Sequence, residues 1–343
     1  MQDIIKTNNL TKNANLIFMV KKFLFAVILI TLLISPSLYV TAASAYEDKT
    51  FIKWVDFNAS EEMLKKVYSL DLKYHNTDVD FKFIEVMAYL ATKNGNNFSS
   101  SQDNKNLNAL IKRLENKETV SQIYGDNKYY KYYLECFEAV FSKLIGNYTL
   151  EGSSEVQYGM TAYFPMAKGY WNTHYDDFGS DRSFGYRRPH LGHDIMGSIG
   201  TPIIAVEGGV VTELGWNRYG GWRIGIRSFD TKRYYYYAHL RKNRPYAQGL
   251  KKGGVIEAGQ VIGYLGITGY SDKENVNMKT GNPHLHFGLQ LIFDESQIDG
   301  NGEIWIDLYN ITKFLYMNQA SVEKNEETKE FKSTNLRRLI SFN

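Results

Sequence analysis

The first half of the chain repeats its hydrophobic residues with the period of an amphipathic helix. In the segment EEMLKKVYSLDLKY, Leu64 and Val67 belong to an apolar stripe at a spacing of three and four residues. Asn58 and Glu61 precede it at the spacing of a capping box. We therefore predict four or five short helices, packed as a small bundle, across residues 46–150. The other helical segments are DFKFIEVMAYLATK, NLNALIKRLEN and YKYYLECFEAVFSKLI.

The pattern changes after residue 150, where short runs of β-branched and aromatic residues are bounded by glycines. Residues 151–300 contain 24 of the 28 glycines, which indicates many tight turns between short strands. The strand-like runs are IIAVEGGVVTELGW, RIGIRSF, KRYYYYAHL and HLHFGLQLIF. The later segment IDLYNITKFLYM predicts a helix packed on the sheet edge. Polar residues dominate from Asn318 onward, which predicts a flexible tail.

Together these patterns predict an α+β chain with three regions after its N-terminal segment. We expect a helical domain over residues 46–150, a β-rich domain over residues 151–317 and a polar tail over residues 318–343. The length of 343 residues agrees with this division, because roughly 150 residues per domain gives about two domains.

Residues 1–45 have the organisation of a targeting segment. Lys21 and Lys22 precede the uninterrupted apolar run FLFAVILITLLI, and small residues follow it up to Ala45. This order is typical of a secretory signal peptide, here cleaved after Ala45. A retained membrane anchor is the alternative, because residues 23–40 have about the minimum length that spans a bilayer. Both interpretations place the functional part of the chain outside the cytoplasm.

Charge and cysteine content narrow the classes of function. The chain has 40 basic and 37 acidic residues and a net charge of +3, which is too balanced for a protein held mainly by nucleic-acid phosphates. Cys136 is the single cysteine, which excludes an intramolecular disulfide framework and a cysteine-based zinc cluster. A metal site in this chain would therefore use histidine, aspartate or glutamate.

Six of the seven histidines fall within a third of the chain, between residues 174 and 286. His190 and Asp194 are separated by three residues in the segment HLGHD. His284 and His286 alternate along a predicted strand, so both side chains point to the same face. Two histidines, one carboxylate and an open fourth position form the kind of site that binds catalytic zinc.

This combination resembles the M23 family of zinc metallopeptidases, of the lysostaphin/LytM type. The family pattern is His-x3-Asp followed downstream by His-x-His, and the resemblance covers residues 160–295. It implies a mostly antiparallel β-sheet domain that lines a groove. It also implies endopeptidase activity on the peptide cross-links of bacterial peptidoglycan. Further runs similar to the family are GTPIIAVEGGVV, YYAHL, VIEAGQVIGYLGITG and NPHLHFGL.

Residue by residue, the resemblance implies that His190, Asp194 and His286 hold zinc. His239 and His284 match the two histidines beside the metal. Zinc lowers the pKa of a bound water towards 7, so that a neutral histidine can take its proton. We expect His284 to act as this base and His239 to stabilise the oxyanion, although the sequence does not separate the two roles.

Some residues near the motifs have no place in the family pattern. His193 stands where the family has an apolar residue, and in an extended segment it would point away from Asp194, so we do not expect it to be a ligand. His174 is either a groove residue or a surface histidine. The side chains of residues 234–237, all tyrosines, alternate between faces, so that two line the groove and two pack inward. The turn around Tyr219 forms the groove rim or caps the sheet.

Two other functions fit parts of the sequence. A non-catalytic scaffold or activator at the cell envelope would share the fold, but we would expect it to have lost ligands that this chain retains. A lipoyl or biotinyl carrier would explain the run VIEAGQVIGYLGITG, but no lysine lies between Val255 and Tyr270 to carry the group.

The expected partner is the peptide part of peptidoglycan, with no nucleic acid. The expected place of action is the cell wall. The protein would be secreted or attached to the outer face of the membrane through residues 23–40. The oligomeric state and the role of the helical region stay open.

Overall fold

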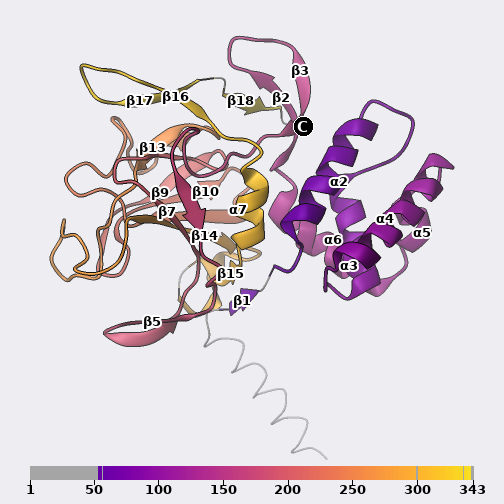
Figure 1. The fold of residues 1–343 in the computed structure, drawn as a ribbon, viewed down its shortest axis with the longest axis horizontal. Helices are drawn as coiled ribbons and strands as arrows, with labels where there is room; N and C mark the ends of the chain where they lie inside the picture. The colour runs from indigo at the N-terminus through magenta and orange to yellow at the C-terminus, as the bar shows by residue number, and fades with distance from the viewer. Residues whose placement is uncertain (1–52, 56, 299, 335, 341–343) are drawn as a thin grey trace, which may run out of the picture. The chain divides into compact units, whose positions relative to one another are not determined.

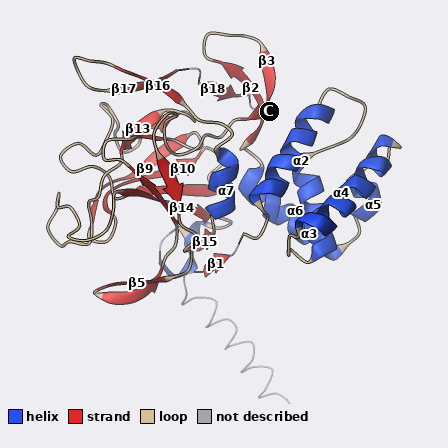
Figure 2. Ribbon diagram, viewed as in Figure 1, coloured by secondary structure: helices blue, strands red, loops and turns tan. Residues whose placement is uncertain are grey.

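Helices come first and most strands second along the chain, as Figure 1 and Figure 2 show. The computed structural model describes residues 53–55, 57–298, 300–334 and 336–340. The predicted signal or anchor, residues 1–45, lies outside this part. Among the described residues, no helix has both the length and the apolar character that crossing a membrane requires.

The described helices agree with the predicted bundle, because five of them lie between residues 61 and 141. Ser60 caps the first, since its side chain accepts a hydrogen bond of 3.3 Å from the Met63 N–H. The predicted cap at Asn58 is therefore wrong by two residues. The helices are α2 (Glu61–Tyr74), α3 (Phe83–Asn94), α4 (Ser100–Glu115), α5 (Val120–Tyr124), α6 (Lys128–Phe141) and α7 (Tyr309–Leu315).

The main sheet has nine strands, and all its pairs are antiparallel except that of β1 with β15. Its order is β1-β15-β14-β11-β10-β9-β12, and β7 pairs with both β14 and β4. The antiparallel α+β fold predicted from the sequence is confirmed. The strands are β1 (Lys53–Val55), β4 (Asn172–His174), β7 (His193–Gly197), β9 (Gly209–Asn217), β10 (Gly221–Ser228), β11 (Arg233–Ala238), β12 (Val255–Ile256), β14 (His284–Leu291) and β15 (Ile304–Ile306).

Smaller sheets surround the main one. They contain β2 (Ile145–Leu150), β3 (Val156–Met160), β5 (Asp181–Phe184), β6 (Tyr186–Pro189), β8 (Pro202–Ile204), β13 (Val261–Tyr264), β16 (Ser321–Lys324), β17 (Phe331–Thr334) and β18 (Arg337–Leu339). Two 3-10 helices complete the described elements, η1 (Glu295–Gln297) and η2 (Gly300–Gly302).

The C-terminal residues differ from the predicted flexible tail. The strands β16 and β17 form a hairpin, and β18 pairs with β2. Phe331 packs against Tyr264 at 6.1 Å between ring centres, and the Ser333 hydroxyl donates a 2.5 Å hydrogen bond to the Gly259 carbonyl. These few anchors lie within a polar stretch, which is why composition alone predicted a tail.

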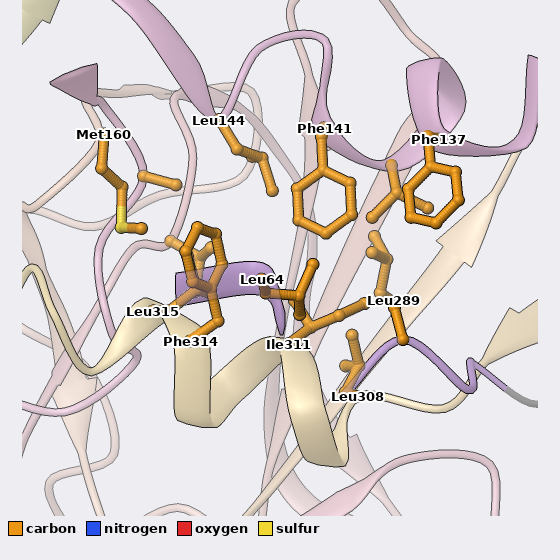
Figure 3. Close-up of a cluster of buried hydrophobic side chains, with 14 of the residues drawn as sticks. Leu64, Phe137, Phe141, Leu144, Met160, Leu289, Leu308, Ile311, Phe314 and Leu315 are labelled. Carbon is orange, nitrogen blue, oxygen red and sulfur yellow. The ribbon is translucent and has the colours of Figure 1, made fainter. Parts of the chain in front are cut away.

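One hydrophobic core joins the helices to the sheet (Figure 3). Phe314 on α7 lies 5.6 Å from Tyr68 on α2, 5.8 Å from Phe83 on α3 and 6.2 Å from Phe141 on α6, measured between ring centres. Leu289 on β14 belongs to the same core. Residues 53–298 and 303–340, where described, accordingly form one compact unit. The predicted domain boundaries stay predictions.

A buried arginine makes a second link between the helices and the sheet. The Arg233 side chain on β11 has no exposed surface and forms a two-pronged ion pair with Glu207, at 2.7 and 3.0 Å. Its Nη2 also lies 2.7 Å from Asp230, and its Nη1 donates to the Ala139 carbonyl on α6 at 3.0 Å. Tyr235 donates a further hydrogen bond of 2.7 Å to Glu207. Every charge of this cluster therefore has a partner.

Asp71 on α2 is a buried carboxylate whose ionisation works against folding. It accepts hydrogen bonds from the Phe83 N–H at 3.2 Å and from the Tyr158 hydroxyl at 2.6 Å. Burial is the largest influence on its pKa and raises it above the usual value, although these hydrogen bonds lower it. The folded protein therefore keeps this proton at pH values where the unfolded chain has lost it, so the contribution of Asp71 to stability falls as pH rises.

We expect Asp71→Asn to gain stability relative to the wild type as the pH rises from about 3 to about 7, because the amide cannot ionise. The side-chain carbonyl of asparagine can still accept from the Phe83 N–H. Urea unfolding of both proteins across this pH range measures the difference. A difference that stayed constant or shrank with pH would contradict the role given to Asp71.

Candidate active site

The register of β7 against β14 brings the two histidine motifs together. Asp194 on β7 lies opposite His286 on β14. On the other side of β14, Ala238 of β11 also lies opposite His286, and His239 follows it directly in the chain. His190 precedes β7 and contacts His286 across 96 residues of sequence. Strand pairing thus gathers residues that are far apart in the chain.

Three side-chain atoms converge at the centre of this site. His190 Nε2 lies 2.9 Å from His286 Nδ1 and 3.1 Å from Asp194 Oδ1, and His286 Nδ1 lies 3.0 Å from the same Oδ1. Burial raises the pKa of Asp194, but hydrogen bonds with the two histidines outweigh it and hold the pKa well below its usual range. Two imidazole nitrogens and an ionised carboxylate so close together suit one divalent cation of borderline softness.

Asp177 and Arg182 contact the ligand candidates: Asp177 contacts His190, and Arg182 contacts Asp194. His190 Nδ1 lies 3.3 Å from the Asp177 carbonyl and 3.1 Å from the Asp177 Oδ1, so Nδ1 donates to Asp177, and Nε2, which faces Asp194 and His286, could bind a cation after losing its own proton. Arg182 pairs with Asp177 and lies 3.3 Å from Asp194 Oδ2. Burial lowers the pKa of His190, but hydrogen bonds with Asp177 and Asp194 outweigh it and raise the pKa to about 9.

Gly192, in the HLGHD segment, leaves the space that the His286 side chain occupies next to the backbone. A Cβ atom on Gly192 would lie 2.5 Å from His286 Nε2 and 3.0 Å from the Phe287 carbonyl. The edge of the imidazole therefore rests against the backbone at Gly192, which directs Nδ1 towards Asp194. A larger residue at this position would push His286 out of the site.

His239 and His284 stand together beside the three converging atoms. Their ring centres are 4.6 Å apart, and His284 Nε2 lies 3.9 Å from Asp194 Oδ1. His239 Nδ1 donates to the Thr268 carbonyl at 2.8 Å, and His284 Nδ1 donates to the Asn282 carbonyl at 2.7 Å. Both Nε2 atoms therefore keep a lone pair. Burial, followed by the nearby histidines, lowers the pKa of His239 well below its usual value.

His193 points away from the site, as its extended position predicted. It is buried on the opposite face of β7, where its Nε2 lies 2.7 Å from His174 Nδ1 and its ring contacts Tyr309 on α7 at 5.6 Å. His174 is thus a half-buried partner of His193 and neither a groove residue nor a free surface histidine. The same contact places α7 on a face of the sheet and not on its edge.

The tyrosine run divides between two faces, as its alternation predicted. Tyr235 and Tyr237 are 1% and 0% exposed and pack in the core. Tyr236 faces the site, with its ring 5.8 Å from that of His286. The ring of Tyr270 is 5.7 Å from that of His239. The site therefore has aromatic walls.

Sequence reasoning missed Asp177, Arg182 and Tyr270, which contact the site from loops and a hairpin. They lie among other charged and aromatic residues, so their side chains resemble those of a solvated surface. The acidic pair at residues 176–177, shortly before the HLGHD segment, is the one sequence feature that pointed to Asp177.

Comparison with known proteins finds a match to the part of the chain that contains this site. The fold and the converging donors define an antiparallel β-sheet domain with a histidine–carboxylate centre. Residues 188–299 match the family described as Peptidase family M23. This part of the chain is therefore a domain of peptidase family M23, which confirms the resemblance inferred from the sequence.

Two curated relatives and one solved structure illustrate the match. The L-Ala–D-Glu endopeptidase of Bacillus subtilis (strain 168) is 45% identical over 112 residues, which cover 33% of this chain and 32% of that protein. The glycyl-glycine endopeptidase ALE-1 of Staphylococcus capitis is 38% identical over 99 residues, or 29% of this chain and 24% of that protein. The catalytic domain of lysostaphin from Staphylococcus simulans is 32% identical with a TM-score of 0.31, covering 42% of this chain and 92% of that one.

The match thus spans about a third or less of the curated relatives named above.

Proposed function

We propose that this chain is a zinc-dependent endopeptidase that hydrolyses peptide cross-links of bacterial peptidoglycan. The observation that carries the proposal is the convergence of His190 Nε2, Asp194 Oδ1 and His286 Nδ1 within 3.1 Å of one another. Support also comes from the family, because curated relatives of the matching region are named as endopeptidases.

The donor set fits zinc. His190, Asp194 and His286 would hold the ion, and three protein ligands leave the fourth position that catalytic zinc sites keep open. When bound, zinc would lower the pKa of a water towards 7 and polarise the carbonyl of the bond to be cut. Asp177 and Arg182 would keep the ligands oriented, as the partners of metal ligands commonly do.

The two histidines beside the ligands would serve in acid–base catalysis and in stabilising the oxyanion. We assign the base to His284, because its Nδ1–H is fixed by the Asn282 carbonyl and its Nε2 is free to accept a proton near Asp194. We assign oxyanion stabilisation to His239, which is held in the same way by Thr268. Its lowered pKa leaves Nε2 without a proton in the free protein, so His239 would take this role only after a proton reaches Nε2 during the reaction.

The substrate implies where the protein works. Peptidoglycan lies outside the cytoplasm, so the chain would be exported by the signal or anchor predicted in residues 1–45. Membrane association through residues 23–40 belongs to the same proposal. The curated relatives are named for two different bonds, L-Ala–D-Glu and glycyl-glycine, so both are substrates to test.

The metal content of the purified chain and its hydrolysis of purified peptidoglycan test the proposal together. We expect about one zinc per chain. Release of new amino groups should stop after chelation and return when zinc is added. Zinc without hydrolysis of either bond would contradict the proposed substrate. No zinc and no hydrolysis would favour the alternative, a non-catalytic scaffold or activator of the LytM type at the cell envelope.

A further inference from the structure

Arginines gather around the hairpin β5–β6 that leads into the active site. Arg188 on β6 has no carboxylate at ion-pair distance among the described residues, and its Nη1 atom is buried without a hydrogen-bond partner there. Its three neighbours are all ion-paired: Arg182 with Asp177 and Asp194, Arg187 with Asp181, and Arg218 with Asp272. Among these four arginines in the described part of the chain, Arg188 is thus the one without an ion pair.

Arg188 lies one aromatic ring away from the catalytic histidines. Its guanidinium carbon is 4.4 Å from the ring centre of Tyr219 and 5.6 Å from that of Tyr270. Tyr270 in turn lies 5.7 Å from His239, which is 4.6 Å from His284, between ring centres. The guanidinium carbon therefore lies at most about 11 Å from the ring centre of His239, a distance that an extended peptide spans in about three residues.

The two tyrosines orient the guanidinium without using its hydrogen bonds. Stacking on ring faces fixes the plane of an arginine, while its N–H groups remain as donors. A planar fork of donors matches a carboxylate, which can accept two parallel hydrogen bonds. A neutral amide offers a single acceptor and no charge. The most favourable ligand for such a group is thus a free carboxylate.

We propose that Arg188 binds a free carboxylate of the substrate peptide, within about three residues of the bond that is cut. This subsite would select acidic stem peptides over neutral ones and over bridges made only of glycine. The inference rests on the proposed peptidase function, because Arg188 would bind the same substrate peptide as the active site. Arg188 would act on substrate binding, and the chemistry would stay with the histidines.

A matched pair of stem peptides tests the subsite, one with D-Glu after L-Ala and the other with the carboxamide D-isoglutamine at the same position. We expect the wild-type protein to favour the acidic peptide by about tenfold or more in kcat/KM, mainly through KM. Arg188→Gln should make the two peptides about equal, and Arg188→Lys should keep part of the preference because lysine retains the charge but lacks the fork. Arg187→Gln is the matched control and should keep the full preference, since Arg187 is exposed and pairs with Asp181.

Three results would overturn the subsite. The first is equal cleavage of both peptides by the wild type. The second is that Arg188→Gln slows both peptides by the same factor, as expected if Arg188 only supports Tyr219 and Tyr270. The third is that Arg187→Gln also loses the preference. If the wild type cleaves neither peptide, hydrolysis of purified peptidoglycan still decides the proposed function separately, and calorimetric binding of the same two peptides decides about Arg188. Tighter binding of the acidic peptide that disappears in Arg188→Gln would support the subsite, and equal or absent binding would overturn it.

Discussion

His286→Ala is expected to lose bound metal and hydrolysis together while the protein stays folded. The substitution removes one of three converging donor atoms and leaves the pairing of β14 with β7 and β11 intact, because that pairing uses the backbone. Loss of a partner that only orients a metal ligand commonly costs 10–100-fold in metal affinity, so loss of a ligand should cost more than about 100-fold. We expect the same result for His190→Ala.

Metal analysis, peptidoglycan hydrolysis and thermal unfolding of the variants measure these effects. His75→Ala is the matched control, because His75 is an exposed histidine at the end of α2 that does not reach the site. It should keep both metal and activity. A His286→Ala protein with full activity would remove His286 from the active site, and one that no longer folds would show that its role is structural.

The second large effect concerns stability. Arg233→Met is expected to destabilise the fold by about 3–5 kcal/mol, because it leaves Glu207 without its buried partner and the Ala139 carbonyl without a donor. Methionine fills much of the same volume, so the loss comes mainly from the unpaired charge. The double variant Arg233→Met/Glu207→Gln should recover part of the loss, since the remaining side chain is then neutral.

Urea unfolding of these variants and of the wild type measures the differences in the free energy of unfolding. Arg227→Met is the control, because Arg227 pairs with the exposed Glu295 and such surface pairs contribute about 0–1 kcal/mol. Equal losses in Arg233→Met and Arg227→Met would show that the Arg233 cluster does not hold the helices to the sheet. No recovery in the double variant would assign the loss to packing and not to charge.

Local patterns predicted the secondary structure well where an element has one buried face. The helix containing Leu64 and Val67 repeats its apolar residues with the helical period. The strand of residues 233–238 is predicted by its run of aromatic residues, and its side chains are buried alternately along most of its length. The strands β16–β18 were missed because few of their residues are buried. In addition, β18 pairs with β2, which lies nearly 190 residues earlier in the chain.

The candidate ligands were predictable for a chemical reason. A chain with one cysteine must use mainly histidine and carboxylate side chains to bind zinc, and four of its seven histidines fall into two short motifs. The residues that support the site had no such signature. Arg182 and Arg188 look alike in the sequence, and only their contacts show that one is paired with Asp177 while the other is stacked on Tyr219.

The sequence by itself determined the kinds of element and the α+β class, and it predicted the five residues of the proposed M23-type site. The tertiary structure alone decided that β7 lies beside β14, with Asp194 opposite His286. It also decided that His193 turns to the far side, to His174. Periodicity depends on neighbours along the chain, whereas strand register and ion pairing depend on residues that folding brings together from distant positions.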